Sequence, residues 1–307
     1  MSIERLVLAA GELIEEHSPL GARSTYRVGG SARAFLSLET HRQLDELAPL
    51  IFECGLPLVV LGNGSNLLVA DGEHDILVVR LRGEFCDLAW HDDADDVDGG
   101  VTVEAGAGLD LPVGARRLSN EGVVGFEWAV GVPGTFGGAV VMNAGGHGSD
   151  MATSVVGVTS RNARGVRHWT RAQLDFSYRS SAIGEGEIVT SVTLSLRHGD
   201  AHDAGERLKE IVRWRREHRP GGANAGSVFQ NPEGDHAGRL IDAAGCRGLR
   251  VRSAVVSEKH ANFIQVDPGG RAEDVYELMR AVRDRVVATS GVQLHTEHRF
   301  VGFEEPL

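Results

Sequence analysis

Cysteine is scarce in this sequence, and the motifs of several common protein classes are missing. The three cysteines, Cys54, Cys86 and Cys246, lie far apart and form no C-x-x-C pair, which argues against a disulfide framework and a zinc site. The G-x-x-x-x-G-K-[ST] motif of nucleoside triphosphatases does not occur. No apolar run is long enough to span a membrane, so membrane insertion is not expected.

Positive charge is also in short supply. The chain has 31 lysines and arginines against 43 aspartates and glutamates, which gives a net charge of −12. Such a surface repels phosphate backbones, so nucleic acid is not an expected partner. Residues 1–21 carry Glu4, Glu12, Glu15 and Glu16 and lack a basic leader, so they predict an amphipathic helix rather than a signal peptide. We therefore expect a cytoplasmic protein.

Glycine, by contrast, is abundant, with 40 of 307 residues where about 7% is usual. Two glycine-rich stretches, 61–72 and 131–148, could expose backbone N–H groups to a phosphate, although many tight turns would give the same composition. Leu67 stands where a third glycine would complete a G-x-G-x-x-G fingerprint, so a Rossmann cofactor loop is not supported. The two loops together favour one dinucleotide held between subdomains.

The apolar pattern predicts a mixture of helices and strands. A strand over 33–39, a helix over 40–55 with Thr40 as its cap, and a buried strand over 57–62 make a βαβ unit. Its second strand ends at the first glycine loop, where α/β sheets bind ligands. One further helix is predicted over 109–122. Further strands are predicted at 76–83, 101–108, 155–159, 166–170 and 188–196.

The last third of the chain is richer in helix. Helices are predicted over 205–220 and 270–291, with strands at 261–266 and 293–303. Polar and small residues near position 200 suggest a boundary between domains 1–200 and 201–307, the first with subdomains of about 20–80 and 81–200. The acidic run at 91–100 could bind a metal, but aspartates at a hairpin tip are more often solvated, so no metal site is predicted.

Seven blocks of sequence carry a family resemblance. In chain order they are STYRVGGSARAFL, PLVVLGNGSNLLVAD, FEWAVGVPGTFGGAVVMNAGGHG, FSYRSSAI, NAGSVFQNP, AGRLIDAAGCRGLRVRSAVVSEKHANFIQV and LHTEHRFVG. Together they resemble the bacterial UDP-N-acetylenolpyruvoylglucosamine reductases, FAD enzymes of peptidoglycan precursor synthesis. The resemblance runs from about residue 20 to the end, and the short spacing after SYRSS is similar to the shorter, second type of the family.

The resemblance implies an α+β protein: an FAD-binding domain of the vanillyl-alcohol-oxidase (PCMH) type, made of two α/β subdomains, and a C-terminal α+β substrate-binding domain. It implies non-covalent FAD, NADPH as hydride donor and a sugar-nucleotide substrate. The expected reaction reduces UDP-N-acetylglucosamine enolpyruvate to UDP-N-acetylmuramate for cell-wall biogenesis, and so serves cell shape and division. The matching flavin-binding residues are Thr25, Gly62, Asn63, Gly64, Ser65, Asn66, Gly131, Val132, Pro133, Gly134, Thr135, Gly137, Gly138 and Ala139.

The resemblance implies catalytic roles for three residues. Ser227 would donate a proton, Arg179 would bind the substrate carboxylate as it gains charge, and Glu297 would orient the reacting group. Tyr178 and Asn231 match substrate-contact positions. Taken singly, the three catalytic candidates could be a turn serine, a surface ion-pair partner and an edge-strand residue. Their joint occurrence in matching blocks favours catalysis.

Three departures from the family pattern leave alternatives open. Gln230, His147 and Ile183 stand where lysine, tyrosine and phenylalanine are usual in the family. Because none of them is a catalytic candidate, an active enzyme is still expected. One alternative is another oxidoreductase of the same FAD fold, an oxidase in which His147 could tether the flavin. The other is a non-catalytic flavin-binding homologue.

Overall fold

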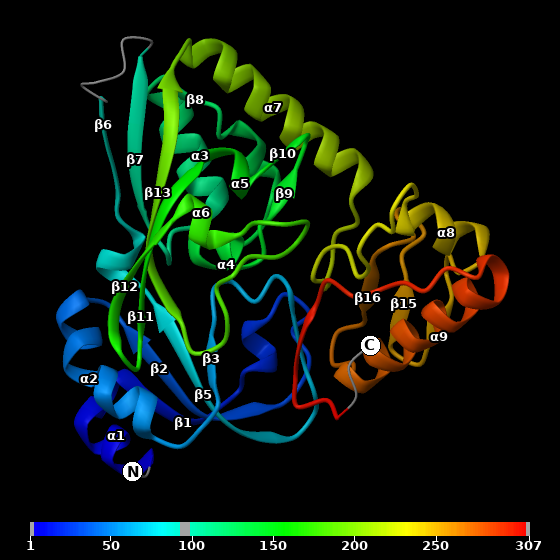
Figure 1. Ribbon diagram of the computed structural model, residues 1–307. Helices are drawn as coiled ribbons and strands as arrows, with labels where there is room; N and C mark the ends of the chain where they lie inside the picture. The colour runs from blue at the N-terminus through cyan, green and yellow to red at the C-terminus, as the bar shows by residue number, and fades with distance from the viewer. Residues whose placement is uncertain (1–2, 93–98, 305–307) are drawn as a thin grey trace. The chain divides into compact units, whose positions relative to one another are not determined.

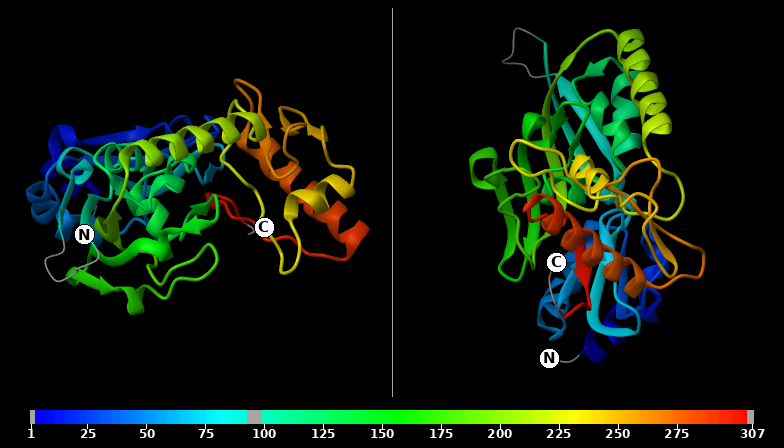
Figure 2. Two further views of the ribbon diagram at one scale, coloured as in Figure 1. Left: turned by 90° about the horizontal axis from the view of Figure 1, so that it is seen from above. Right: turned by 90° about the vertical axis from the view of Figure 1, so that its right-hand side faces the viewer.

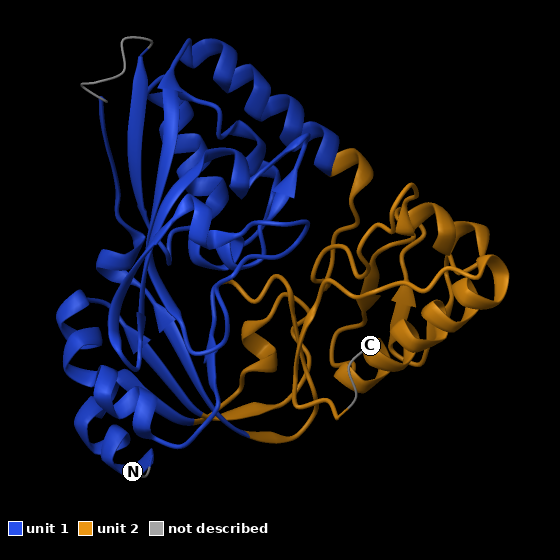
Figure 3. Cartoon of the chain, viewed as in Figure 1, with its two compact units in different colours: residues 1–16, 34–62, 75–215 blue, residues 17–33, 63–74, 216–307 orange. Residues whose placement is uncertain are grey.

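The computed structural model describes residues 3–92 and 99–304, and the chain forms two compact units. Unit 1 contains residues 1–16, 34–62 and 75–215, and unit 2 contains residues 17–33, 63–74 and 216–307 (Figure 3). The helices and strands carry the labels of Figure 1. No helix in the described ranges is both long and apolar enough to cross a membrane.

The first sheet of unit 1 contains the predicted βαβ unit. Its strand order is β1-β2-β5-β3, formed by Ile14–Ser18, Ser31–Leu38, Glu73–Leu81 and Leu58–Val60. Helix α2 (His41–Glu53) connects β2 to β3, and β3 lies parallel to β5. Thr40 and Gln43 form a reciprocal capping box at the start of α2, as its sequence predicts. The βαβ prediction is confirmed, with β5 between its two strands.

The second sheet of unit 1 is antiparallel and has strand order β12-β11-β13-β7-β6, with β8 also paired to β13. The predicted strands at 101–108, 155–159, 166–170 and 188–196 are confirmed here. The strands are β6 (Leu88–Asp92), β7 (Gly100–Gly106), β8 (Val123–Val124), β11 (Val155–Asn162), β12 (Gly165–Thr170) and β13 (Ile188–His198). Residues 93–98 of the acidic run lie outside the described residues.

Short helices pack onto this antiparallel sheet. Helix α4 (Phe136–Val141) contacts both β13 and β7, which fixes the second glycine loop against the sheet. The remaining elements of unit 1 are α1 (Ile3–Ala10), α3 (Leu111–Asn120), α5 (Met151–Ser154), α6 (Arg171–Leu174), β9 (Gly145–Gly146), β10 (Ser149–Asp150) and the 3₁₀ turns Gly11–Leu13, Gly83–Cys86 and Glu127–Gly131. Helix α7 (Ala201–His218) belongs to unit 1 up to Arg215, and its last three residues belong to unit 2.

Unit 2 is built on a small antiparallel sheet and a long helix. Strands β14 (Arg250–Val251), β15 (Ala254–Val256) and β16 (Ile264–Val266) form the sheet, and α9 (Ala272–Ser290) packs along it and against α8 (Ala237–Ala243) (Figure 2). A second, parallel pair joins β4 (Leu67–Val69) to β17 (Arg299–Val301). A 3₁₀ turn at Gly21–Arg23 completes the unit. The predicted helices over 205–220 and 270–291 correspond to α7 and α9.

Three local predictions need correction. The N-terminal helix ends at Ala10, because Gly11 adopts a φ of +54° and the residues after Leu13 form β1 instead. The last strand is shorter than predicted, because only Arg299–Val301 has a ladder partner, β4. Strand β3 is not buried throughout, since Val60 is 41% exposed.

The two units are discontinuous in sequence, whereas the sequence suggested a boundary near residue 200. That position is the start of α7, whose Leu208 and Ile211 belong to the core of unit 1. Segments 17–33 and 63–74 cluster with the C-terminal residues instead, because Gly30 donates to Ala70 and β4 pairs with β17. These pairings join residues far apart in sequence, so local pattern cannot reveal them.

Candidate active site

The two glycine loops meet inside unit 1, at Gly62 and Thr135. A Cβ atom on Gly62 would lie 2.5 Å from the Oγ1 atom of Thr135, so a side chain does not fit there. Thr135 caps α4, and its Oγ1 accepts a hydrogen bond of 3.4 Å from the Gly138 N–H. Within residues 3–92 and 99–304, the N–H groups of Gly62, Gly134 and Thr135 donate to no protein atom. Backbone donors from both loops are therefore available to an anionic group.

Other residues of the second loop are occupied by the fold itself. The Gly137 N–H donates to Ala107 at 2.9 Å, and a Cβ on Gly137 would lie 3.0 Å from the Ala107 Cβ. The Ala139 N–H donates to Thr135 within the first turn of α4. These two positions can therefore offer close approach to a ligand but no amide donor. Of the other matched positions, Val132 is half-buried and Pro133 is exposed.

Gly131 lies against the side chains of His147, Ile211 and Arg215, which follow it in the sequence. A Cβ on Gly131 would be 2.7 Å from Nε2 of His147, and the His147 and Trp214 rings meet edge to face with centroids 5.0 Å apart. Arg215 donates to the Gly131 carbonyl, and burial lowers the pKa of its guanidinium. His147, one of the three departures, therefore lies directly beside the predicted flavin loop.

Tyr178 and Arg179 form the tip of a two-residue turn in unit 1. Ser177 and Ser180 pair across the base of the turn, and Arg179 has a left-handed φ of +58°. Its Nη2 donates to the Gly145 carbonyl at 3.3 Å, and its guanidinium carbon lies 5.1 Å from the Tyr178 ring centre. The base of the turn is anchored by Asn143.

The buried amide of Asn143 fixes this turn. It donates from Nδ2 to the Ser177 carbonyl at 2.9 Å and accepts at Oδ1 from the Ala152 N–H at 3.0 Å. Asn143 itself has a φ of +40°, a conformation that asparagine tolerates better than most residues. Asn143 therefore holds the base of the turn that carries Arg179, and so acts as a positioning residue of unit 1.

In unit 2, the first glycine loop packs beside the segment that carries Glu297. Thr25 donates to the Gly64 carbonyl from its N–H at 3.1 Å and from Oγ1 at 3.3 Å. Asn66 donates from Nδ2 to the Glu297 carbonyl at 2.8 Å, and its own carbonyl accepts from the Arg299 N–H at 2.9 Å. Asn63 and Ser65 are half-buried between these contacts.

Ser227 lies on the neighbouring extended segment of unit 2. The Val228 carbonyl accepts from the Glu297 N–H at 2.8 Å, and Phe229 bridges to Thr296, so the two segments run side by side. Gly226, with a φ of +83°, turns the chain just before the serine. The half-buried Ser227 hydroxyl makes no hydrogen bond with the described residues, so it remains available to a substrate.

The other side of the Ser227 segment is held by Asn262. Its buried amide accepts from the Phe229 N–H at 2.9 Å and donates to the Phe229 carbonyl at 2.8 Å, and its carbonyl accepts from Val228. Asn262 therefore positions the segment that carries Ser227. Asn231 is exposed and accepts from the Ala237 N–H at 3.0 Å, at the start of α8.

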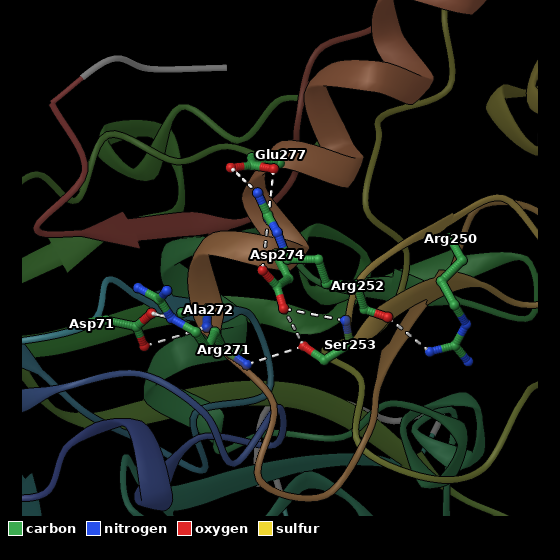
Figure 4. Close-up of polar contacts among 8 residues, drawn as sticks. All are labelled: Asp71, Arg250, Arg252, Ser253, Arg271, Ala272, Asp274 and Glu277. Atoms are coloured by element: carbon green, nitrogen blue, oxygen red, sulfur yellow. Dashed lines mark hydrogen bonds and ion pairs between the residues drawn. The ribbon is translucent and has the colours of Figure 1, made fainter.

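A polar network fixes the 63–74 segment to the N-terminus of α9 (Figure 4). Asp71 accepts from Arg271 at 3.1 Å and from the Ala272 N–H at 3.4 Å. Beside it, the buried Asp274 accepts from Ser253 and Arg252. Burial acts to raise the pKa of Asp274, but these donors hold it below its usual range. The glycine loop of unit 2 is therefore anchored to its longest helix.

The structure thus distributes the predicted residues over both units. Unit 1 brings together Gly62, the 131–139 loop and, on a separate turn, Tyr178 and Arg179; unit 2 brings together Thr25, Gly64, Asn66, Ser227 and Glu297. The other two residues that depart from the family pattern are Ile183 and Gln230. Ile183 is buried in the unit 1 core, and the Gln230 N–H donates to the His295 carbonyl. Sequence reasoning singled out neither Tyr26 nor His298, a buried pair beside Ser227.

Two family models match the chain. One describes an FAD-binding domain and matches residues 32–171, and the other describes the C-terminal domain of UDP-N-acetylenolpyruvoylglucosamine reductase and matches residues 218–301. A protein of that name from Paramagnetospirillum magneticum is 43% identical, with 93% of this chain and 91% of the relative covered. A second, from Symbiobacterium thermophilum, is 40% identical, with 94% and 92% covered.

Solved structures agree with the sequence comparisons. The crystal structure of the Thermus caldophilus reductase matches with a TM-score of 0.79 at 35% identity, covering 94% of this chain and 98% of that one. A BBE-like 1 variant from Physcomitrella patens matches with a TM-score of 0.54 at 14% identity, covering 95% and 90%. The second likeness shows the fold alone. The predicted α+β fold class, with its PCMH-type FAD-binding domain, is confirmed.

Proposed function

Because the chain belongs to the UDP-N-acetylenolpyruvoylglucosamine reductase family, we propose that it reduces UDP-N-acetylglucosamine enolpyruvate to UDP-N-acetylmuramate. NADPH would be the reductant, and FAD would be bound without a covalent link. The product would enter peptidoglycan synthesis in the cytoplasm and so support cell shape and division.

The residues present fit an FAD pyrophosphate. Gly62, Gly134 and Thr135 offer backbone N–H groups that donate to no other described residue, and the glycines allow the cofactor to approach the backbone closely. When bound, FAD would take hydride from NADPH and pass it to the terminal carbon of the enolpyruvyl group. In unit 2, Thr25 donates to the Gly64 carbonyl and Asn66 donates to the Glu297 carbonyl, so these two residues hold the loop that contains Gly64.

The second half of the reduction needs a proton donor. Hydride addition to the terminal carbon leaves an electron pair on the neighbouring carbon, where it spreads into the carboxylate. The Ser227 hydroxyl would deliver a proton to that neighbouring carbon, so that hydride and proton together saturate the double bond. Its half-buried position and its lack of a hydrogen-bond partner among the described residues support this role.

Arg179 and Glu297 would bind and orient the substrate during this proton transfer. Arg179 would bind the substrate carboxylate through its planar guanidinium while negative charge develops there. Glu297 would orient the enol ether, because its backbone is bonded both to Val228 and to Asn66. Tyr178, 52% exposed at the tip of the Arg179 turn, and Asn231, exposed ahead of α8, are the proposed sugar-nucleotide contacts.

The observation that carries the proposal is the pairing of the Ser227 segment with the Glu297 segment in unit 2. The test is the visible spectrum of the purified protein, in which NADPH should bleach a flavin band and the enolpyruvyl sugar nucleotide should restore it without oxygen. Bleaching without restoration would instead support a non-catalytic flavin-binding homologue. UDP-N-acetylglucosamine, which lacks the enolpyruvyl group, is the matched control.

Acid precipitation separates the proposal from the oxidase alternative. The yellow colour should stay in solution after the polypeptide is removed, because the proposed flavin is not covalently bound. Colour retained on the precipitate would point to a tether, for which His147 beside Gly131 is the candidate.

A further inference from the structure

Beneath the Ser227 segment, Tyr26 and His298 form a buried polar pair. The Tyr26 side chain is fully buried and that of His298 is 6% exposed. The Tyr26 hydroxyl and Nε2 of His298 are 3.2 Å apart, and their rings are tilted with centroids separated by 5.7 Å. Both residues belong to unit 2, although they come from opposite ends of the chain.

The pair lies near the backbone on both sides of Ser227. Burial raises the pKa of Tyr26, and the nearby Ala225 backbone opposes this shift. Burial lowers the pKa of His298 to about 4, and the nearby Val228 backbone opposes that shift. Tyr26, Ala225 and Val228 belong to the same buried core of unit 2, and the Glu297 N–H, next to His298 in the chain, donates to the Val228 carbonyl at 2.8 Å. The pair therefore lies beside the backbone that flanks Ser227.

The buried His298 side chain lowers the stability of the fold. Its Nδ1 is buried and has no hydrogen-bond partner among the described residues. An incompletely satisfied buried ring nitrogen destabilises a protein relative to an apolar side chain of similar size. Core packing therefore does not account for a histidine at this position.

The residues that precede Tyr26 and His298 in the sequence are both candidates for the proposed active site. Thr25 precedes Tyr26 and bonds to Gly64, and Glu297 precedes His298 and bonds through its N–H to Val228. Both neighbours are half-buried, whereas Tyr26 and His298 are buried. The pair thus connects three segments that each contribute a side chain or loop to the proposed site.

We propose that Tyr26 and His298 are positioning residues that set the height and orientation of the Ser227 hydroxyl through the backbone of Ala225 and Val228. The inference rests on the proposed function, in which Ser227 delivers the proton. Only one side-chain torsion, χ1, can change the position of a serine Oγ atom. The direction of the hydroxyl therefore depends on the position of its backbone. The pair acts through Ser227 and touches no reacting atom itself.

The first test is Tyr26→Phe, with Tyr276→Phe as the matched control. Tyr276 is also a buried tyrosine of unit 2, but its ring stacks on Phe303. Tyr26→Phe should slow sugar-dependent flavin reoxidation about 10- to 100-fold, because small misplacements of a reacting group cost that much. Flavin reduction by NADPH should change less than about twofold, within the scatter expected for a residue remote from that step. Equal rates for Tyr26→Phe and Tyr276→Phe in both half-reactions would overturn the proposal.

The double variant Tyr26→Phe/His298→Leu separates positioning from stability. Replacing both polar partners by apolar side chains should restore the melting temperature lost in Tyr26→Phe, because neither member of the pair is then left without the other. The reoxidation defect should remain. Recovery of both properties together would mean that the pair is only structural and would contradict the inference.

A double-mutant cycle with Ser227→Ala distinguishes this inference from the proposed function. If Ser227→Ala reoxidises normally, the proton-donor role fails. If Ser227→Ala is impaired, adding Tyr26→Phe should slow reoxidation by less than about twofold more, because both changes remove the same contribution. Multiplied defects would show that the pair acts elsewhere and would overturn the positioning role.

Discussion

In unit 1, Arg179 stands at the tip of a tight turn, whereas in unit 2 Ser227 lies on an extended segment that is hydrogen-bonded on both sides. Each arrangement depends on one buried asparagine: Asn143 holds the turn through Ser177, and Asn262 holds the extended segment through Phe229. A long guanidinium can adjust to its ligand from a turn. A short hydroxyl cannot, so the fold must place its backbone more accurately.

The largest effect should follow from removing the short hydroxyl. Ser227→Ala should slow sugar-dependent flavin reoxidation by about 10²–10⁴-fold, the usual cost of a lost acid–base group, while NADPH reduction stays nearly intact. Ser227→Cys should retain more activity, because a thiol also donates a proton. Stopped-flow absorbance of both half-reactions measures this, and unimpaired reoxidation in Ser227→Ala would exclude the proton-donor role.

Arg179→Lys tests the turn of unit 1 and should have the next largest effect. Lysine keeps the charge but loses the planar fork, so sugar-dependent turnover should fall by about a hundredfold, as for one lost transition-state donor. The same stopped-flow experiment should show a smaller loss in NADPH reduction. Equal losses in both half-reactions would mean that Arg179 supports the site generally.

Asn262→Ala tests how strongly the Ser227 segment depends on its buried amide. The change leaves the N–H and carbonyl of Phe229 without their side-chain partner, so the free energy of unfolding should fall by about 2–4 kcal/mol. Denaturant unfolding followed by circular dichroism gives this value. Asn224→Ala is the control, because among the described residues the Asn224 amide bonds only within its own turn, and its loss should cost about 1 kcal/mol or less. Similar losses would show that burial of Asn262 adds nothing.

The pH dependence of stability should report the buried histidine of unit 2. The pKa of His298 is lowered to about 4, below the usual value of about 6.5, so the unfolded chain binds a proton more readily than the folded one. Its contribution is constant above pH 6.5, and about 3 kcal/mol of stability is lost as pH falls from 6.5 toward 4. His298→Gln should flatten the melting-temperature profile across this range; parallel profiles for the two proteins would contradict a buried neutral His298.

Much of the local structure could be predicted from the sequence because the responsible signals are local. Apolar spacing and Thr40 as a cap identified α2, and helical periodicity ending at Gly291, whose φ is +72°, identified α9. The glycine loops at 61–72 and 131–148 were recognised as phosphate-binding candidates, and the structure shows that they meet at Gly62 and Thr135. Strands β4 and β17 are short and pair with each other across a long stretch of sequence. The local pattern did not predict β4, and it predicted a strand longer than β17.

The sequence by itself therefore determined the periodic elements, the loop chemistry and, through seven matching blocks, the family. Only the tertiary structure decided which of these parts share a unit: segments 17–33 and 63–74 fold with the C-terminal residues. It also brought Tyr26 and His298 together beneath Ser227, and Arg215 onto the Gly131 carbonyl. Periodicity depends on neighbours along the chain, whereas a buried polar contact requires segments distant in sequence to converge at hydrogen-bonding distance.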